Sequence, residues 1–340
     1  MRGGGKADNV SVTIESLSDL ETRGFVVARG FLDTAELAML RADFAGVAVG
    51  ANRNYRSKAP TAMVLAALRP RIDDVLAQVN AQTTLHVDAH VPNNSAYFGT
   101  DAAEGTSFPW HQDHESYFVV QNHFDYLNFY VPFVKPDPHK SNLSVIPFDV
   151  LQQHSRRASR FLERGGAGSF RHVRHHWVAT NDDSGRSKVI SADLDGLAVT
   201  PELEEGDLLL LRGDIVHRTQ DTDTDRVALS WRTADGATIV KRSRLASGSM
   251  RKAVMMRNNA LPYQKMFQAF DAAAKDELPL RELLAAYESM PTPDPMSSDV
   301  FFKYLMREKR RAHVMGRFVA HMPIEAGFKG LDRLQRALHR

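Results

Sequence analysis

The sequence predicts a mostly β core of jelly-roll type with helices added at both ends. From Thr83 to about Arg232 the hydrophobic pattern has a period of two, and β-branched and aromatic residues accumulate. Many short stretches of this kind follow one another through turns, without intervening helices, which is typical of an antiparallel sandwich or barrel. On either side of this region the apolar residues recur at helical spacing.

The N-terminal part is expected to brace the sheet and to carry no chemistry. Residues 1–14 are glycine-rich and polar, so we expect them to be disordered. Asp33 or Thr34 can cap a helix, and Pro70 suggests a break between two further helices. The predicted elements are a helix over 17–24, a strand over 25–32, and helices over 35–45, 61–68 and 71–79.

The rest of the chain divides into a β region and a helical extension. We predict strands over 84–91, 108–118, 124–134, 143–147, 170–178, 188–190, 197–199, 208–211, 216–217 and 226–232. Helices follow over 251–270, 280–287, 301–315 and 329–338. The predicted division is a barrel domain over 15–245 and a helical extension over 246–340, which could be a lid, a homodimer contact or a basic solvated face.

Composition excludes several classes of site. The 340 residues include no cysteine, which removes disulfides, thiolate-bound metals and thiol nucleophiles. A formal charge of +2 gives no whole-chain case for nucleic acid or membrane partners. No apolar run is long enough to span a membrane, and the start lacks a signal-peptide core, so a cytoplasmic location is the expectation. Any metal must be bound through His, Asp and Glu.

A metal motif lies in the segment over 108–118. Read as a strand, it projects His111 and Asp113 to one face, because side chains two apart point the same way. A histidine and a carboxylate are two members of the 2-His-1-carboxylate triad of non-haem Fe(II) sites. The distant segment over 207–217 ends in His217, which can supply the second histidine.

Four segments follow one another along the chain: the helix–strand–helix over 23–41, the His111-Gln-Asp113 motif, the strand over 142–147 and the segment over 205–217. In this order they resemble the Fe(II)/2-oxoglutarate dioxygenases of the phytanoyl-CoA dioxygenase-like superfamily. The stretch Phe108-Pro-Trp-His-Gln-Asp-His-Glu-Ser-Tyr117 is particularly similar to the metal motif of the ectoine hydroxylase branch. The resemblance covers residues 17–235 and implies a cupin-like double-stranded β-helix. One departure is Phe148-Asp149 after Pro147, where the family usually has Gly-Ser-His.

The resemblance also implies a cofactor site. Fe(II) would be held by His111, Asp113 and His217, with 2-oxoglutarate and O₂ as co-substrates. The C5 carboxylate of 2-oxoglutarate needs a buried arginine, which suits it because the planar guanidinium binds carboxylates with two hydrogen bonds. Arg226 is the favoured residue and Arg232 its rival, because both lie on one face of the same strand. The remaining candidates for the cofactor site are Ser230 and Asn128.

The substrate site is less defined in the sequence. Aromatic side chains near the motifs could line a pocket; they are Trp110, Tyr117, Tyr130 and Trp231. His86, Asp88 and His90 alternate on one predicted strand and are interpreted as a substrate-side or surface row, because three ligands on one straight strand do not easily surround an ion.

The expected activity is hydroxylation of a C–H bond in a small metabolite, with release of succinate and CO₂. Related halogenases have a small residue in place of the carboxylate, so Asp113 argues for hydroxylation. Desaturation, cyclisation and epoxidation by the same oxidant stay open. So do a cupin-like isomerase or binding protein without redox chemistry, and a barrel with a vestigial metal site whose helical tail mediates association.

Overall fold

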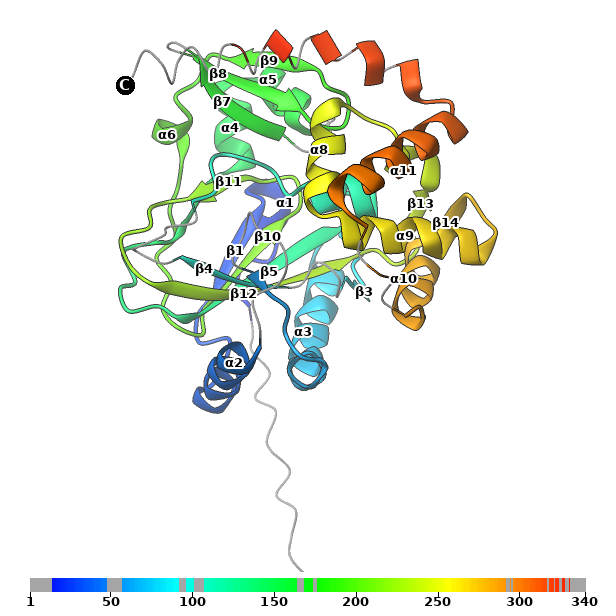
Figure 1. The fold of residues 1–340 in the computed structure, drawn as a ribbon. Helices are drawn as coiled ribbons and strands as arrows, with labels where there is room; N and C mark the ends of the chain where they lie inside the picture. Colours follow the sequence, from blue (N-terminus) through cyan, green and yellow to red (C-terminus); the bar gives the residue numbers. More distant parts are fainter. Residues whose placement is uncertain are drawn as a thin grey trace, which may run out of the picture.

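A computed structural model of the chain describes most of the predicted barrel and extension (Figure 1). The described residues are 14–47, 57–91, 96–100, 107–163, 168–173, 176–291, 294, 296–316, 318–320, 322–323, 326–327 and 330. Apart from Ile14 and Gly330, the predicted disordered segment over 1–14 and the predicted last helix over 329–338 lie outside this set.

The larger sheet is antiparallel and has the strand order β1–β10–β5–β12–β4–β2, with β3 paired to β12. Its strands are β1 Phe25–Ala28, β2 Ser57–Lys58, β3 Ala89–His90, β4 Ala96–Thr100, β5 Tyr126–Val134, β10 Leu208–Arg212 and β12 Arg226–Ala234. The long central strands β5 and β12 pair with each other from Tyr126 opposite Ala234 to Val134 opposite Val227.

The smaller sheet forms around His111. Strand β11 (Val216–Thr219) pairs with β6 (Leu143–Ile146), while β7 (Gly168–Val173), β8 (His176–Asn181) and β9 (Ser187–Ile190) form a second group. His111 joins the two groups, because its backbone bridges His217 of β11 on one side and Ser169 of β7 on the other. The predicted mostly β core of jelly-roll type with added helices is confirmed by these two antiparallel sheets.

Alternation along β5 and β12 separates an apolar face from a polar one. Phe129, Val131, Leu229 and Trp231 point outward into a cluster shared with the N-terminal helices. These helices, α2 (Thr34–Gly46) and α3 (Ala62–Gln82), cover this face at the bottom of Figure 1. The residues that alternate with these four on β5 and β12 therefore face the interior of the barrel, where the smaller sheet lies.

Several local predictions need correction. Residues 62–82 form one helix that contains Pro70, so the break predicted there is wrong. The predicted strand over 170–178 is a hairpin, since β7 and β8 pair antiparallel. Helices also interrupt the β region; they are α4 Phe148–His154, α5 Arg156–Glu163 and α6 Leu194–Leu197. After the bridge at His111, the chain turns into a π-helix at Ser116–Val120 instead of continuing as a strand.

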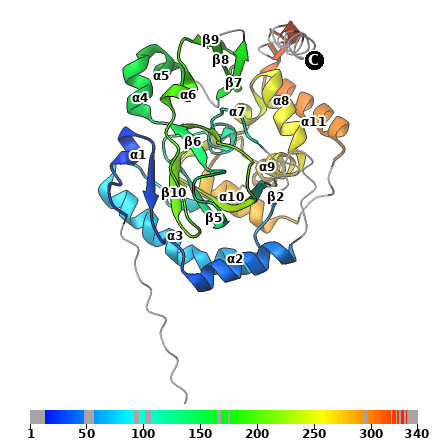
Figure 2. The same cartoon turned by 90° about the vertical axis from the view of Figure 1, so that its left-hand side faces the viewer.

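The C-terminal extension packs directly against the barrel. One apolar cluster combines Tyr126 and Ala234 of the large sheet with Phe267 and Phe301 of the extension. Its elements are β13 Ile239–Lys241, α7 Arg242–Ala246, α8 Met250–Asn258, α9 Ala260–Ala273, β14 Glu277–Pro279, α10 Leu280–Ser289 and α11 Ser298–Arg311, preceded at the N-terminus by α1 Asp19–Thr22. Figure 2 shows α8 and α11 standing beside the barrel. None of the described helices is long and apolar enough to cross a membrane.

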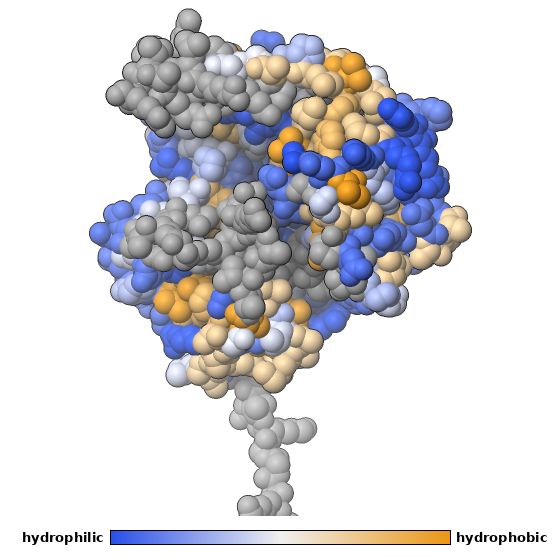
Figure 3. Space-filling model, in the orientation of Figure 1, coloured by the Kyte–Doolittle hydropathy of each residue, from blue (hydrophilic) through white to orange (hydrophobic). Residues whose placement is uncertain are grey.

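The outer side of the extension carries many basic side chains. Those exposed on α11 are Lys303, Arg307, Arg310 and Arg311. In the space-filling view, hydrophilic side chains lie along the right-hand edge of the extension, next to apolar ones (Figure 3). The predicted homodimer contact through these helices stays a prediction.

Lys309 on α11 provides a pH-dependent test of how the extension is packed. Its side chain is fully buried, with Nζ donating to the Ala246 carbonyl at 2.6 Å, and burial lowers its pKa to about 7. The unfolded chain protonates a lysine up to a pKa of about 10.4, so unfolding takes up a proton between these two values. Stability contributed by this group therefore rises from about pH 7 to about pH 10. Lys309→Met should stabilise the protein most below pH 7 and least near pH 10 in denaturant titrations.

The matched control is Lys303→Met, an exposed lysine on the same helix. Its effect on the free energy of unfolding should not vary with pH over this range. A Lys309→Met effect that is equal at all pH values would contradict a buried, neutralised amine.

Candidate functional site

Three side chains from two distant segments meet on the inner face of the smaller sheet. The backbones of His111 and His217 exchange two hydrogen bonds, each of 2.9 Å, so the two imidazoles lie side by side with ring centroids 4.3 Å apart. Asp113 follows two residues later and places Oδ1 3.7 Å from Nε2 of His217. One ligand atom from each of the three residues lies within 4.8 Å of the others.

Backbone carbonyls orient both imidazoles toward the common point. Nδ1 of His111 lies 2.7 Å from the Pro109 carbonyl, and Nδ1 of His217 lies 3.1 Å from the Ile215 carbonyl. A neutral imidazole that donates from Nδ1 presents the lone pair of Nε2, which is how metal-bound histidines are usually held. Two Nε2 atoms and one carboxylate oxygen are a donor set that fits Fe(II), with positions left open for other ligands.

The charges in the site keep these donors in the forms that bind metals. Burial, and then the neighbouring His217, lower the pKa of His111 to about 3, so this imidazole is neutral at physiological pH. Burial alone would raise the pKa of Asp113, but Arg232 and the two histidines outweigh it and lower the pKa to about 2. Protons therefore do not compete with a cation for either residue near pH 7.

The second oxygen of Asp113 is held by the large sheet. Nδ2 of Asn128 donates to Oδ2 at 3.2 Å, and a guanidinium nitrogen of Arg232 lies 3.8 Å from the same oxygen. The Asn128 amide is fixed in turn by the Ser230 hydroxyl, which donates to its oxygen at 2.8 Å. These contacts leave Oδ1 of Asp113 to face the two histidines.

Arg226 lies further along β12, on the same inner face. It is 2% exposed and donates to the hydroxyl of Tyr130, whose ring lies 5.6 Å from the guanidinium carbon. Its Nε is buried without a hydrogen-bond partner, and no carboxylate of the described residues forms an ion pair with it. An unpaired buried cation is strongly unfavourable, so this position fits an anionic group that enters the barrel. Lys135, whose pKa burial and Arg226 lower to about 8, adds positive potential there.

Arg226 and Arg232 thus occupy different environments, although the sequence cannot separate them. Arg232 is committed to Asp113 and to the region of Tyr126. Arg226 shares no contact with the three clustered residues, because it lies at the other end of β12.

Four of the predicted substrate residues lie away from this cluster. The indole of Trp110 is 1% exposed on the opposite face, donates to Asp195 at 3.0 Å and contacts Arg218. Trp231 also points outward and donates to His90 at 3.0 Å. Tyr117, in the π-helix, is fully buried and stacks on His123 at 4.3 Å. The prediction that these three rings line a pocket beside the triad is not met.

His86 is the fourth. It is exposed and lies 3.2 Å from Asp235, in a second group of possible metal ligands with Asp88. Asp88 is already paired with Arg281 at 2.5 Å and accepts a hydrogen bond from the Gly236 backbone. His86 therefore lies at the surface, and its role on the substrate side stays a prediction.

Sequence reasoning missed two residues of the site. Tyr126 alternates with Asn128 and Tyr130 on β5, so the period of two could have placed it on the inner face beside Arg232. Ser169 lies directly opposite His111, and no sequence signal could have identified it, because this pairing joins an irregular segment to an inserted hairpin.

Neither a protein-family model nor a curated protein sequence matches the chain. Among solved structures, it is similar to SnoK, a non-heme α-ketoglutarate dependent carbocyclase from nogalamycin biosynthesis, with 14% identity and a TM-score of 0.44 over 69% of this chain and 88% of that one. EctD from S. alaskensis, with 2-oxoglutarate and 5-hydroxyectoine, shows 16% identity and a TM-score of 0.44 over 69% and 80%. HygX from Streptomyces hygroscopicus, with nickel, 2-oxoglutarate and hygromycin B, shows 15% identity and a TM-score of 0.42 over 65% and 87%.

Proposed function

We propose that the chain is an Fe(II)- and 2-oxoglutarate-dependent oxygenase that hydroxylates a C–H bond of a small molecule. The observation that carries this proposal is the convergence of His111, Asp113 and His217 in the same barrel as Arg226, a buried cation without a carboxylate partner. A metal site alone would need no such cation. A co-substrate with a chelating end and a distal carboxylate requires both the metal site and the buried cation.

The roles of the residues follow from their contacts. His111, His217 and Oδ1 of Asp113 hold the iron, which supplies the O₂ activation and electron transfer when bound. Asn128 and Arg232 hold Oδ2 of Asp113, so the carboxylate presents one oxygen to the metal.

Arg226 binds the C5 carboxylate of 2-oxoglutarate, and the hydroxyl of Tyr130 orients its guanidinium. The interior around these two residues is apolar and includes Leu143, Val145 and Leu209, which excludes water from the bound co-substrate. Ser230 lies between Arg226 and Arg232 on the inner face of β12, and its hydroxyl donates to Asn128 at 2.8 Å.

The overall reaction balances without another reductant. One oxygen atom of O₂ enters succinate as 2-oxoglutarate loses CO₂, and the other enters the substrate C–H bond as a hydroxyl group. Asp113 occupies the position that a halide would need, and for this reason we propose hydroxylation rather than halogenation.

The test measures how much succinate the purified full chain forms from 2-oxoglutarate when no substrate is added. Mass spectrometry detects the succinate. We expect slow formation that requires both Fe(II) and O₂ and stops when Zn(II) replaces Fe(II). The His217→Ala variant gives the background. Succinate at or below this background, under conditions where the wild-type chain binds Fe(II), would reject the oxygenase and favour a binding protein or isomerase without redox chemistry.

A further inference from the structure

The hairpin β7–β8 and strand β9 extend the row of side chains that contains the two histidines. Ser169 lies opposite His111, Thr180 opposite Ser169, and Ser187 opposite Thr180. Directly opposed residues of antiparallel strands project to the same face of the sheet. Three hydroxyl groups therefore continue the row of the proposed iron ligands across the sheet.

Both faces of these three strands carry polar and apolar side chains. On the face away from His111, Phe170, Ala179 and Ile190 pack into a cluster with Leu151 and Leu162 of the inserted helices α4 and α5. The three hydroxyl groups lie on the other face, in one row with His111.

An arginine of the C-terminal extension reaches the same face. The Ser169 hydroxyl donates to the carboxylate of Asp182, which follows β8, and the other oxygen of Asp182 lies 2.6 Å from Nε of Arg251. Asp182 is 1% exposed. Arg251 lies in the first turn of α8. Helix α8 lies beside β7 and β8 in both ribbon views (Figures 1 and 2).

The first turn of α8 is held at this place by two further contacts. The hydroxyl of Ser249 donates to the Asp182 carbonyl at 2.5 Å, and Lys252 pairs with Asp183 at 2.8 Å. The position of the Arg251 backbone therefore does not depend on its own ion pair with Asp182.

One donor of Arg251 is left open. Its terminal nitrogen Nη1 is buried and has no hydrogen-bond partner among the residues that the structure describes. Buried donors in native proteins are nearly always satisfied, by protein, water or ligand. The open donor belongs to a guanidinium that is linked through Asp182 to Ser169, and Ser169 lies opposite His111.

We propose that Ser169, Asp182 and Arg251 form a substrate subsite that binds hydroxyl groups of an uncharged, polyhydroxylated molecule such as a glycoside or cyclitol. This inference rests on the proposed function, because it takes the triad as the reaction centre. A hydroxyl group both donates and accepts, so it matches a carboxylate and a guanidinium held side by side. The opposite charges of Asp182 and Arg251 cancel, which favours a neutral ligand over an ionic one. Thr180 and Ser187 provide further hydroxyls along the same row.

The experiment is saturation-transfer NMR on the full chain loaded with Zn(II), which occupies the triad without oxygen chemistry. The probes are methyl α-D-glucopyranoside, methyl α-D-mannopyranoside and myo-inositol, together with 2-methoxytetrahydropyran as a ring without hydroxyl groups. We expect at least one polyol to bind in the millimolar range and the hydroxyl-free ring not to bind, because a site built for hydroxyls rejects analogues that lack them.

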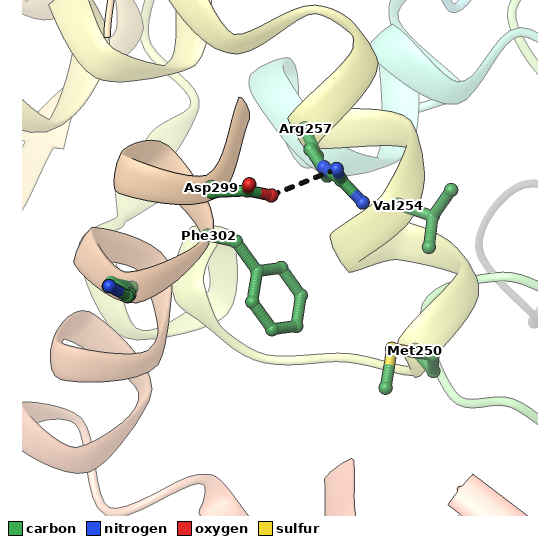
Figure 4. Close-up of a pocket in the computed structure, with 6 residues that line it drawn as sticks. Met250, Val254, Arg257, Asp299 and Phe302 are labelled. Carbon is green, nitrogen blue, oxygen red and sulfur yellow. Dashed lines mark hydrogen bonds and ion pairs between the residues drawn. The ribbon is translucent and has the colours of Figure 1, made fainter. Parts of the chain in front are cut away.

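Variants separate the subsite from the general stability of α8. Arg251→Met and Ser169→Ala should each weaken polyol binding by about tenfold or more, since each removes a hydrogen-bonding group. The matched control is Arg257→Met on the same helix. Arg257 pairs with Asp299 of α11 at 3.1 Å, at a groove between α8 and α11 that Met250, Val254 and Phe302 also line (Figure 4). Binding should be unchanged in this variant.

The subsite would be overturned by the absence of any polyol binding to the wild-type chain or by equal binding of the hydroxyl-free ring. Polyol binding that survives both Arg251→Met and Ser169→Ala would overturn it as well. Tighter, Arg251-dependent binding of cyclohexanecarboxylate would also overturn it, because it would identify an anionic substrate. The 2-oxoglutarate titration of the same preparations is independent, so polyol binding without 2-oxoglutarate binding would reject the proposed reaction and keep the subsite.

Discussion

Replacing His217 by alanine is expected to lower the affinity for Fe(II) by more than about 100-fold, since even the residues that only support metal ligands contribute about 10- to 100-fold. The variant removes one of two Nε2 donors and leaves His111 and Asp113, which by themselves cannot complete the triad. Succinate formation should fall to the level without added iron. Anaerobic competition with a chromophoric chelator measures the affinity directly.

His139→Ala is the matched control for this change. His139 is an exposed histidine paired with Glu202 at 2.9 Å, and it is not one of the three clustered ligands. Its removal should leave iron affinity and activity unaltered. Cooperative thermal unfolding of the iron-free His217→Ala protein shows that the fold survives. If such a folded variant still bound Fe(II) as tightly as the wild type, His217 would not be a ligand.

Arg226→Met should raise the dissociation constant of 2-oxoglutarate by about 30- to 1,000-fold, because removing one partner of a buried charge pair costs about 2–4 kcal/mol. Methionine keeps the apolar length of the side chain and removes only the guanidinium that faces the proposed C5 carboxylate. Iron affinity should not change, since Arg226 contacts Tyr130 and none of the three ligands. Anaerobic titration with 2-oxoglutarate gives the constant.

Two other arginines serve as comparisons. Arg218→Met removes a guanidinium on the outer face of β11, where it pairs with Asp195 at 2.9 Å, and should leave 2-oxoglutarate binding intact. Arg232→Met should mainly weaken iron binding, because Arg232 supports Asp113. Should Arg232→Met abolish 2-oxoglutarate binding while Arg226→Met has no effect, the assignment of the two residues would have to be reversed.

The sequence alone predicts those helices and strands whose residue pattern is local and repeated. The capping box of Asp33 and Glu36 begins α2 as its residues predict, and the alternation in β5 and β12 matches their inner and outer faces. The same alternation contains information that the prediction of pocket residues did not use. Trp110 neighbours His111, and Trp231 lies between Ser230 and Arg232, so both had to point away from the inner face.

Other features depend on contacts between distant parts of the chain. The distinction between Arg226 and Arg232 requires the positions of Tyr130 and Asp113, which no spacing on β12 provides. Pro70 does not interrupt α3, because the packing of Leu68 and Ile72 against the sheet outweighs the loss of one backbone hydrogen bond. Nor could the sequence show that Arg251 of the extension meets Asp182 of the inserted hairpin.

The most direct test of the iron and 2-oxoglutarate site is an anaerobic absorption titration of the full chain. Fe(II) is added first and 2-oxoglutarate second, and the weak visible band of an iron-bound 2-oxo acid is followed. We expect the band to appear only when both are present, to saturate at one 2-oxoglutarate per chain, and to be missing in His217→Ala. A wild-type chain that binds Fe(II) but shows no band at saturating 2-oxoglutarate, or a band of full strength in His217→Ala, would contradict it.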